Sequence, residues 1–490
     1  MGRFHDIDLH AIARDTMFQY GFDPHFSKEV IQKVQSMSEE AELAKEISSL
    51  PDLRHLLWSS IDNGDTLDLD QIEYCKLMPN GDVNVKIGIA DVDAFVTKDD
   101  LIDLHAAKNT SSVYTGIETF PMLPVKLSTN LTSLKQDEDR VAVIIEYSVP
   151  PDGNIHTENI YRATVRNQAK LAYNEIGDYL EGKTDVPESV MKFPGLEEQL
   201  KLQNEAAERL ISYRMEHGSL ELNTREALPI VKNNKITAMT TIKHNKARDL
   251  IENFMVAANR TMVNFIEKAN TPLIQRIVRE PKEWDRIRQI AFEHNEILPN
   301  KPDAKALQQF LFRQRNKNPE RYPDLSLTIV KLLGSGEYVM IEPDKKPYGH
   351  FGLAVTDYTH ATAPNRRYVD VIIQRIVKSI LANRKNPYSE EELVELSMRC
   401  TQREKSAKKV ERFMRKAAAA ALLDDKIGKI FEGIITGASC KGYYARIIDP
   451  PVEGRVHSKS DDLFVGQKIK VRLKSLDPYQ GHIDFESIQF

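Results

Sequence analysis

The chain has 490 residues, of which 41% are hydrophobic and 28% are charged, and its formal net charge at pH 7 is −5. This composition is typical of a globular protein with more than one domain, and it excludes a uniformly basic protein that binds nucleic acid over its whole surface. No apolar run approaches the roughly 18 residues of a membrane span, and the first residues lack the order of a signal peptide. Three widely spaced cysteines indicate a reducing compartment, so we expect a cytoplasmic protein without membrane association.

Residues 1 to 50 are predicted to be helical. Apolar residues recur at helical spacing from Ile7 to Phe18 and again from Val30 to Met37, and Ser27 is a candidate N-cap for the second helix. Two interpretations stay open for this segment. It is either a helix-turn-helix module or a group of helices packed on the next domain.

Residues from about 50 to 170 are predicted to be rich in β-structure. The pattern predicts a strand from Ile72 to Met78, a tight turn at Asn80-Gly81 and a return strand from Val83 to Ala90. A second hairpin is expected from residues 141–149 and 155–165.

Residues 168 to 424 are predicted to be mainly helical. The expected helices are 168–181, 196–217, 247–268, 282–293, 303–315, 365–384 and 390–423. Between Arg399 and Lys416 the last of them carries eight Lys or Arg and only two acids, Glu404 and Glu411. This stretch is either a solvated helix face or a surface that contacts nucleic-acid phosphates.

Residues 425 to 490 are predicted to form a small OB-type barrel, because short β runs alternate there with Gly and Pro turns. The segment from Lys441 to Tyr444 places a basic residue and two aromatic residues at a strand start, which suits stacking of single-stranded bases. Buried core tyrosines are the alternative. The expected fold is therefore α+β, with domains at 1–50, 51–424 and 425–490.

The segment from Leu57 to Tyr74 holds a dense group of acids. They are Asp62, Asp65, Asp68, Asp70 and Glu73. Carboxylates this close repel one another unless a cation lies among them, and Mg2+ prefers oxygen ligands from carboxylates and phosphates. An acidic surface loop and a helix cap are the alternatives. A calcium loop of the EF-hand type is excluded, because Leu67 stands at the position that requires glycine.

An acidic metal loop, a basic helix and an OB-type barrel together indicate hydrolysis of a nucleic-acid phosphodiester. Specific stretches sharpen this interpretation. They are SIDNGDTLDLDQ, GIADV, PMLP followed by KLS and SL, AKLAY and HFGLAVTDYTHATAPNRRYVD. In these stretches and in their order, residues 50 to 423 resemble the catalytic RNB domain of the ribonuclease II family. The C-terminal segment resembles the OB-fold of ribosomal protein S1.

The resemblance implies a processive, magnesium-dependent exoribonuclease, with Mn2+ as an alternative ion. Such an enzyme degrades single-stranded RNA from its 3′ end and releases nucleoside 5′-monophosphates. Asp62, Asp68 and Asp70 match the first three aspartates of the family's acidic motif. Gln71 stands where the fourth is expected, and an amide oxygen binds a metal more weakly than a carboxylate. Asp65 is a candidate for supplying the missing charge.

The resemblance also implies roles in RNA binding and catalysis. Arg366 falls on the family's catalytic arginine, which grips the scissile phosphate, and Ala363 replaces the family's serine. The side chains expected to contact RNA are Tyr114, Tyr173, Glu252, Arg367 and Glu411. The two tyrosines match aromatic residues near the 3′-terminal nucleotide, and the two glutamates match acids that contact ribose hydroxyls. Judged from the residues alone, ordinary packing or surface ion pairs are the favoured explanation of the two tyrosines and the two glutamates.

The usual members of this family carry two cold-shock barrels where this chain has helical residues 1 to 50. We therefore expect duplexes with 3′ overhangs to be trimmed closer to the paired region than by a three-barrel relative. Two other functions stay open: a catalytically impaired RNB-fold protein that binds RNA, and a DNA-binding regulator built on the N-terminal helices. The expected partner is RNA with a single-stranded 3′ end, and no stable protein partner is predicted.

Overall fold

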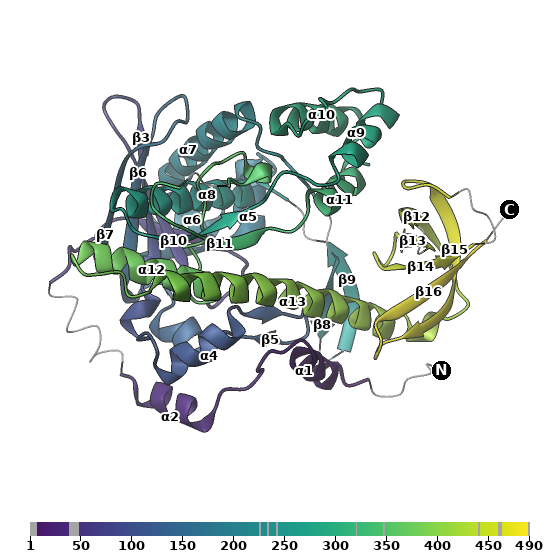
Figure 1. Ribbon diagram of the computed structural model, residues 1–490, viewed down its shortest axis with the longest axis horizontal. Coiled ribbons are helices and arrows are strands. Elements are labelled where there is room, and N and C mark those ends of the chain that lie inside the picture. The colour runs from purple at the N-terminus through teal and green to yellow at the C-terminus, as the bar shows by residue number, and fades with distance from the viewer. Residues whose placement is uncertain are drawn as a thin grey trace.

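The computed structural model (Figure 1) describes residues 7–38, 49–224, 227–232, 235–241, 244–319, 321–345, 348–439, 442–458 and 463–488. Helices and strands are both abundant in these ranges, as the predicted α+β class requires. No helix within them is long and apolar enough to cross a lipid bilayer.

A closed barrel forms the centre of the large domain. Its strands, in neighbouring order, are β1 (Trp58–Asp62), β2 (Gln71–Leu77), β3 (Val83–Ala90), β6 (Asp139–Val149) and β7 (His156–Ala172). Adjacent strands are antiparallel, except that β7 and β1 are parallel. The predicted first hairpin is confirmed, since β2 and β3 pair along their length around a turn in which Gly81 has a φ of 85°. The second hairpin is confirmed as β6 and β7.

Strand β7 extends further than the sequence indicates. The predicted helix from residue 168 is wrong at its start, because residues up to Ala172 pair with β1, where Ala172 lies opposite Asp62. Ala169 and Leu171 are buried by this pairing. Burial in the barrel outweighs local helix propensity here. Helix α5 (Tyr173–Leu180) begins directly after the strand, so Tyr173 lies beside the end of β1.

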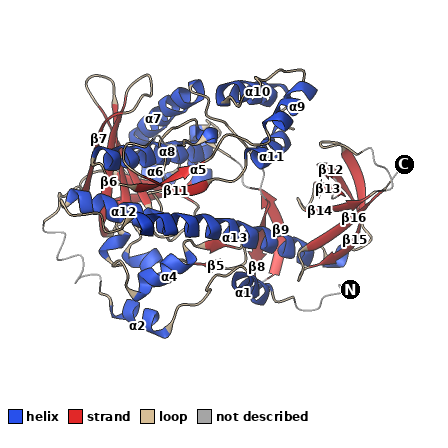
Figure 2. Cartoon of the chain, viewed as in Figure 1, coloured by secondary structure: helices blue, strands red, loops and turns tan. Residues whose placement is uncertain are grey.

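Helices cover the barrel and extend away from it (Figure 2). They are α4 (Leu101–Asn109), α6 (Glu188–Met191), α7 (Leu196–Glu216), α8 (Lys246–Lys268), α9 (Trp284–Glu293), α10 (Ala304–Lys317), α11 (Tyr322–Leu333), α12 (Tyr368–Leu381) and α13 (Glu390–Leu422). The longer helices are as predicted, whereas α4, α6 and α11 are not among those expected. Helix α12 begins at Tyr368 and not at residue 365, because the preceding residues form a turn.

The main core lies between one face of the barrel and helices α7, α8 and α12. Trp58, Ile72 and Ile144 belong to a second cluster on the alternate strand positions. Three two-stranded sheets complete the large domain. They pair β4 (Val113–Tyr114) with β5 (Thr119–Phe120), β8 (Ala227–Lys232) with β9 (Lys235–Thr241), and β10 (Leu273–Ile277) with β11 (Glu337–Ile341).

Helix α13 has 33 residues and begins at a capping box formed by Ser389 and Glu392. In Figure 1 it runs across the molecule toward the C-terminal barrel. It contacts β11, β9, β8 and β16 along the way. One helix therefore connects the central domain with the C-terminal domain.

The predicted five-stranded OB-type barrel at the C-terminus is confirmed. Its strands are β12 (Ile430–Ser439), β13 (Gly442–Ile447), β14 (Glu453–His457), β15 (Lys468–Asp477) and β16 (His482–Ser487), in the order β12-β13-β14-β16-β15. Ala419, Ala420 and Leu423 from the end of α13 belong to its core. Lys441, which the sequence placed in a stacking motif, lies outside the described residues.

The N-terminal helices pack on the large domain. Helix α1 (Leu9–Gln19) packs against α13, where Met17 shares a core with Val410 and Met414. Helix α2 (Lys28–Ser36) packs against α4. Arg403 Nη1 of α13 donates to the Tyr20 carbonyl at 3.2 Å and so ties the connecting segment down. The structure therefore agrees with the second interpretation of this segment, in which the helices pack on the next domain.

Candidate active site

The acidic loop leaves the barrel at the end of β1 and returns at the start of β2. Asp62 Oδ1 accepts hydrogen bonds from the Asn63 amide at 2.7 Å and from Thr66 Oγ1 at 2.9 Å. Lys170 Nζ on β7 donates to the carbonyls of Gly64 and Thr66 at 3.2 Å and 2.5 Å. The loop is therefore held against the barrel, with Asp62 half-buried at its base.

Asp70 lies at the other end of this loop and is only 2% exposed. The Asn365 backbone N–H donates to Asp70 Oδ1 at 2.9 Å, and Arg366 Nε lies 3.3 Å from Asp70 Oδ2. Burial raises the pKa of Asp70 to about 7, although the neighbouring Arg366 acts to lower it. The ionised form of Asp70 therefore depends on a nearby cation.

Asp68 lies between the other two aspartates in sequence, and it interacts electrostatically with both of them. Burial raises the pKa of Asp68, Arg366 lowers it, and the charge of Asp62 raises it. Asp68 in turn acts to raise the pKa of Asp70. Tyr114 Oη of β4 donates to Asp68 Oδ2 at 3.4 Å. Asp68 thus interacts with both Asp62 and Asp70, and it lies next to Tyr114 and Arg366.

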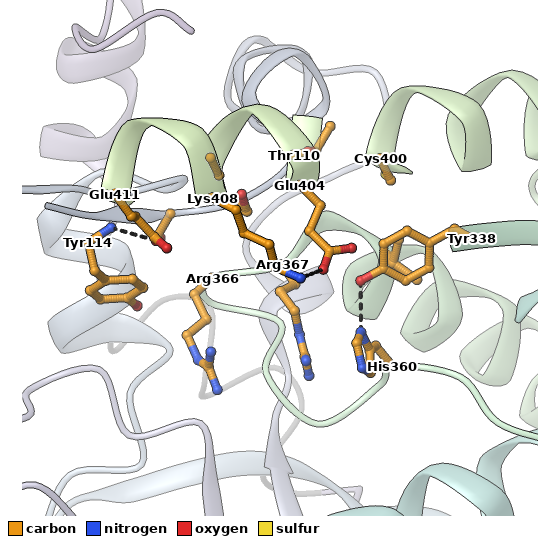
Figure 3. Close-up of a pocket in the computed structure, with 14 residues that line it drawn as sticks. Thr110, Tyr114, Tyr338, His360, Arg366, Arg367, Cys400, Glu404, Lys408 and Glu411 are labelled. Atoms are coloured by element: carbon orange, nitrogen blue, oxygen red, sulfur yellow. Dashed lines mark hydrogen bonds and ion pairs between the residues drawn. The ribbon is translucent and has the colours of Figure 1, made fainter. Parts of the chain in front are cut away.

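A pocket of about 200 Å³ adjoins this site, between α13 and the turn that carries Arg366 (Figure 3). The lining includes Ser111, Ser112, Tyr114, Tyr338, His360, Arg366, Arg367, Lys408 and Glu411. Both arginines point away from α13 in Figure 3, and the Tyr114 amide donates to Glu411 Oε1 at 3.3 Å. The structure therefore brings four of the predicted site residues to one pocket.

The two arginines of this pocket differ in accessibility. The Arg366 side chain is 44% exposed, whereas the Arg367 side chain is 23% exposed and its Nη2 lies 2.8 Å from Asp370 Oδ1. Burial and the charge of Asp370 act oppositely on the pKa of Arg367, and the net effect raises it. Arg366 is consequently the guanidinium with more surface available to a phosphate.

The far wall of the pocket carries polar residues that the sequence did not single out. Glu404 binds Arg276 through two contacts of 2.5 and 2.8 Å and also pairs with Lys408 at 2.7 Å. Tyr338 Oη lies 2.7 Å from His360 Nδ1. Burial, followed by the charge of Arg367, lowers the pKa of His360 well below its usual value, so this ring is neutral. The sequence signals for this wall were the basic stretch of α13 and the stretch HFGLAVTDYTHATAPNRRYVD, which contains His360.

Other predicted residues lie outside the pocket lining. Tyr173 is placed next to Asp62 by the end of β7, and the Arg248 guanidinium lies 4.3 Å from its ring centroid. Glu252 is exposed on α8 and its charge acts on Arg214. Ala363 and Gln71 are buried, at 1% and 9% exposure. Asp65, the candidate for the missing charge, is exposed on the loop.

Asn365 was not predicted and proved to be part of the site. Its amide holds Asp70, its Oδ1 accepts a hydrogen bond from Thr132 Oγ1, and its side chain is 1% exposed. The Asn365 Nδ2 group is buried without a hydrogen-bond partner. The only signal in the sequence was its position next to Arg366 in the stretch APNRRYVD.

In the described ranges, no three His, Cys, Asp or Glu side chains converge closely enough to hold a metal ion by themselves. The donor set nevertheless fits Mg2+, which takes one or two carboxylates and completes its shell with water and substrate phosphate. Asp70 is buried with a raised pKa, the charge of Asp68 acts on it, and the charge of Asp62 acts on Asp68. A divalent cation would offset this concentration of charge, and Asp62, Asp68 and Asp70 are the residues that would hold it.

Comparison with protein families defines the class. The model described as the RNB domain matches residues 51–383, and the model of the RNase II-type exonuclease C-terminal S1 domain matches residues 429–487. The chain belongs to the RNB domain family, and its C-terminal barrel is the S1-type domain found with it.

Individual relatives agree with this assignment. Ribonuclease R of Escherichia coli is 28% identical over 497 residues, which cover 94% of this chain and 60% of that protein. Ribonuclease R of Aquifex aeolicus is 29% identical, with 98% of this chain and 70% of the relative covered. The chain thus spans about 60% of the length of the first relatives it matches.

Solved structures share the fold. The apo form of Mycoplasma genitalium RNase R superposes with a TM-score of 0.86 at 23% identity, covering 98% of this chain and 78% of that one. Yeast Ssd1, described as a pseudonuclease, superposes with a TM-score of 0.73 at 16% identity, covering 97% of this chain and 58% of that one. The fold therefore occurs both with and without nuclease activity, and activity must be argued from the site.

Proposed function

We propose that this chain is an exoribonuclease that hydrolyses single-stranded RNA from the 3′ end and releases nucleoside 5′-monophosphates. Mg2+ is the proposed metal, with Mn2+ as an alternative. The relatives named Ribonuclease R support the reaction class. The observation that carries the proposal is the placement of buried Asp70 against partly exposed Arg366, at one end of a pocket.

The position of each side chain gives it a part in the reaction. Asp62, Asp68 and Asp70 would hold Mg2+. The bound ion would lower the pKa of a water molecule and offset negative charge on the scissile phosphate. Arg366 contacts the phosphate and stabilises the negative charge that develops on its oxygens. Tyr114, which is 41% exposed, offers an aromatic face to the terminal base. Glu411, bonded to the Tyr114 amide, lies where it accepts a hydrogen bond from a ribose hydroxyl.

RNA with a single-stranded 3′ end is the proposed substrate. Mycoplasma genitalium RNase R has been solved in complex with ribose-methylated single-stranded RNA and with double-stranded RNA. In this chain, Lys408 on the basic stretch of α13 lines the pocket. Positive charge on the path to the pocket favours a phosphate backbone and makes binding dependent on salt.

The test is incubation of end-labelled single-stranded RNA and DNA with the chain and Mg2+, with product lengths resolved. We expect nucleoside 5′-monophosphates from RNA, no products from DNA, and no reaction after removal of divalent ions with EDTA. Internal cleavage, or release of mononucleotides from the 5′ end, would contradict the proposal.

A catalytically impaired RNA-binding protein is the second candidate, because Gln71 replaces an acid and Ssd1 shares the fold as a pseudonuclease. It predicts RNA binding without mononucleotide release at any Mg2+ or Mn2+ concentration. The third candidate, a DNA-binding regulator, loses support because α1 buries its apolar face against α13 and not within a separate module.

A further inference from the structure

The basic stretch of α13 separates its charges by face. Both acids of this stretch, Glu404 and Glu411, line the pocket. Lys405, Lys409 and Arg412 recur at helical spacing, so they share another face of the helix, which we call the α13 stripe. All three side chains are exposed. The stripe is therefore uniformly positive, although the chain as a whole has a net charge of −5.

The charges of the stripe face solvent, because the opposite side of the helix is buried. Val410 and Met414 are fully buried in the core that α13 shares with α1. Within the described ranges, none of the three stripe side chains forms an ion pair. Arg399 and Lys408, by contrast, each pair with a glutamate one turn earlier, at 2.6 and 2.7 Å. The stripe charges are thus available to a partner outside the chain.

The stripe extends from the pocket to the C-terminal barrel. Lys408 lines the pocket and is the neighbour of Lys409 in the chain. At the other end, the turn between β15 and β16 packs on the helix, where a Cβ placed on Gly481 would lie 3.3 Å from the Phe413 ring. Tyr479 belongs to the same turn and is 50% exposed. An extended partner can therefore follow the stripe from the barrel to the pocket.

The turn that carries Tyr479 has a fixed backbone. Asp477 Oδ1 accepts hydrogen bonds from the amides of Tyr479 and Gln480, at 2.9 and 3.1 Å. An exposed ring beside a row of cations suits single-stranded nucleic acid, whose bases stack on aromatic side chains while its phosphates contact the cations. The position of the stripe next to the pocket proposed for a 3′ end favours RNA over an acidic protein segment as the partner.

We propose that the α13 stripe and Tyr479 bind the nucleotides of single-stranded RNA that lie upstream of those in the pocket. The inference rests on the proposed function, which places the 3′ end of the RNA in the pocket. The stripe cations contact phosphates, and a base stacks on Tyr479. These contacts hold the RNA while its new 3′ end moves into the pocket after each cleavage. A merely solvated helix face predicts instead that RNA affinity does not depend on these side chains.

The experiment measures binding of fluorescently labelled RNA to the full chain by anisotropy, in EDTA and over a series of KCl concentrations. The stripe variant replaces all three stripe cations by glutamine. The control variant makes the same change at three exposed lysines on and beside α10, which are Lys301, Lys305 and Lys317.

For a long RNA, we expect the stripe variant to bind about tenfold more weakly than the natural chain. The slope of log affinity against log salt should fall by about 2, as loss of three phosphate contacts requires. The control variant should bind the long RNA within about twofold of the natural chain. A short RNA that fills only the pocket should bind equally well to the natural chain and to both variants.

Tyr479 gives a second, independent measurement. Tyr479→Ala should weaken binding of the long RNA by about tenfold without changing the salt slope, because it removes a stacking face and no charge. Tyr479→Phe keeps the ring and should bind like the natural chain.

Equal affinities of the stripe and control variants for the long RNA would overturn the inference, and so would an equal loss of affinity for both RNA lengths. Circular dichroism establishes that each variant is folded. RNA hydrolysis by the natural chain separates the two proposals. A chain that releases mononucleotides but whose affinity for long RNA ignores the stripe contradicts this inference alone. A chain that binds long RNA through the stripe without hydrolysing it contradicts the proposed function alone.

Discussion

Asp70 is held at both carboxylate oxygens, by the Asn365 amide and by Arg366, at the point where the acidic loop enters β2. These two contacts come from residues almost 300 positions away, at separations of 295 and 296. A carboxylate fixed in this way keeps its orientation without reorganising when substrate arrives, which is the condition for a productive metal ligand.

The variant Asp70→Asn should abolish RNA hydrolysis while leaving RNA affinity nearly unchanged. Asparagine keeps the shape but removes the charge, and we expect mononucleotide release to fall by at least about 100-fold. Single-turnover hydrolysis at saturating Mg2+ and fluorescence anisotropy with labelled RNA measure the two effects. Asp65→Asn, in the exposed part of the same loop, is the matched control. An Asp70→Asn protein that hydrolyses RNA at the natural rate would exclude the assigned role.

The variant Arg366→Lys should lower the rate of hydrolysis by about 100-fold with little effect on KM. Lysine keeps the positive charge but loses the planar fork that contacts two oxygens at once. Steady-state kinetics on a short RNA give the two parameters. Arg399→Lys on the exposed side of α13, where Arg399 pairs with Glu395, is the control and should leave both unchanged. A large rise in KM at unchanged kcat would instead assign Arg366 to substrate binding alone.

Between elements, a buried ion network joins the end of β3 to β7 and α12. Asp91 is 2% exposed and lies 2.6 Å from Arg162 and 2.8 Å from Lys378. Burial acts to raise the pKa of Asp91, but Lys378 and Arg162 outweigh it and hold the pKa below its usual value. The network fixes α12, and with it the turn that carries Arg366.

Asp91→Asn should lower the free energy of unfolding by about 3–5 kcal/mol at pH 7, because it removes the buried negative charge that Arg162 and Lys378 share. Since the folded pKa is the lower one, the stabilisation is present above the unfolded value near 3.8 and is lost as pH falls through the folded value. Urea unfolding should therefore show a large difference in the free energy of unfolding between the natural chain and Asp91→Asn at pH 7. The difference should be smaller at pH 3. The exposed change Glu395→Gln should cost less than about 1 kcal/mol. Equal losses at both pH values would contradict the assignment.

The packing of α1 on α13 gives a second prediction at this scale. Met17 is 1% exposed in the shared core, and the adjacent Phe18 is 54% exposed. Met17→Ala should lower the free energy of unfolding by about 2–5 kcal/mol, whereas Phe18→Ala should change it by less than about 0.5 kcal/mol. Urea unfolding followed by tryptophan fluorescence reports the large domain through buried Trp58 and Trp284. No effect of Met17→Ala on this signal would mean that α1 is a separate module.

Across the whole molecule, α13 connects the candidate active site to the C-terminal barrel, since Glu411 lines the pocket and Ala420 lies in the barrel core. Tyr444 on β13 is half-buried and does not belong to that core. On the proposed function, a long RNA would bind at both the pocket and the barrel, whereas a short one would reach the pocket alone.

Tyr444→Ala should weaken binding of a long single-stranded RNA by about tenfold, the loss expected for one stacked base, without changing hydrolysis of a short oligonucleotide. Anisotropy with labelled RNAs of two lengths, together with single-turnover hydrolysis, tests both statements. Equal loss of affinity for both lengths would place Tyr444 elsewhere on the RNA path.

Local patterns in the chain were sufficient to predict many features. The turn at Asn80-Gly81, the C-terminal barrel and the spacing of Asp62, Asp68 and Asp70 depend on neighbours in sequence, and periodicity and turn chemistry report such neighbours directly. The place of Arg366 in one site with the acidic loop was also predicted, but only through resemblance to a family.

Contacts between distant segments could not be predicted. Three features arise when the barrel closes and buries surfaces far apart in sequence. They are the start of α5 at Tyr173, the packing of α1 on α13 and the hydrogen bond from the Asn365 amide to Asp70. Burial also sets the charge states, since the raised pKa of Asp70 and the unpaired carboxylate of Glu73 come from removing water around groups that look ordinary in the sequence. The sequence therefore identifies the chemical groups of the site, whereas the tertiary structure determines their hydrogen-bond partners and their protonation states.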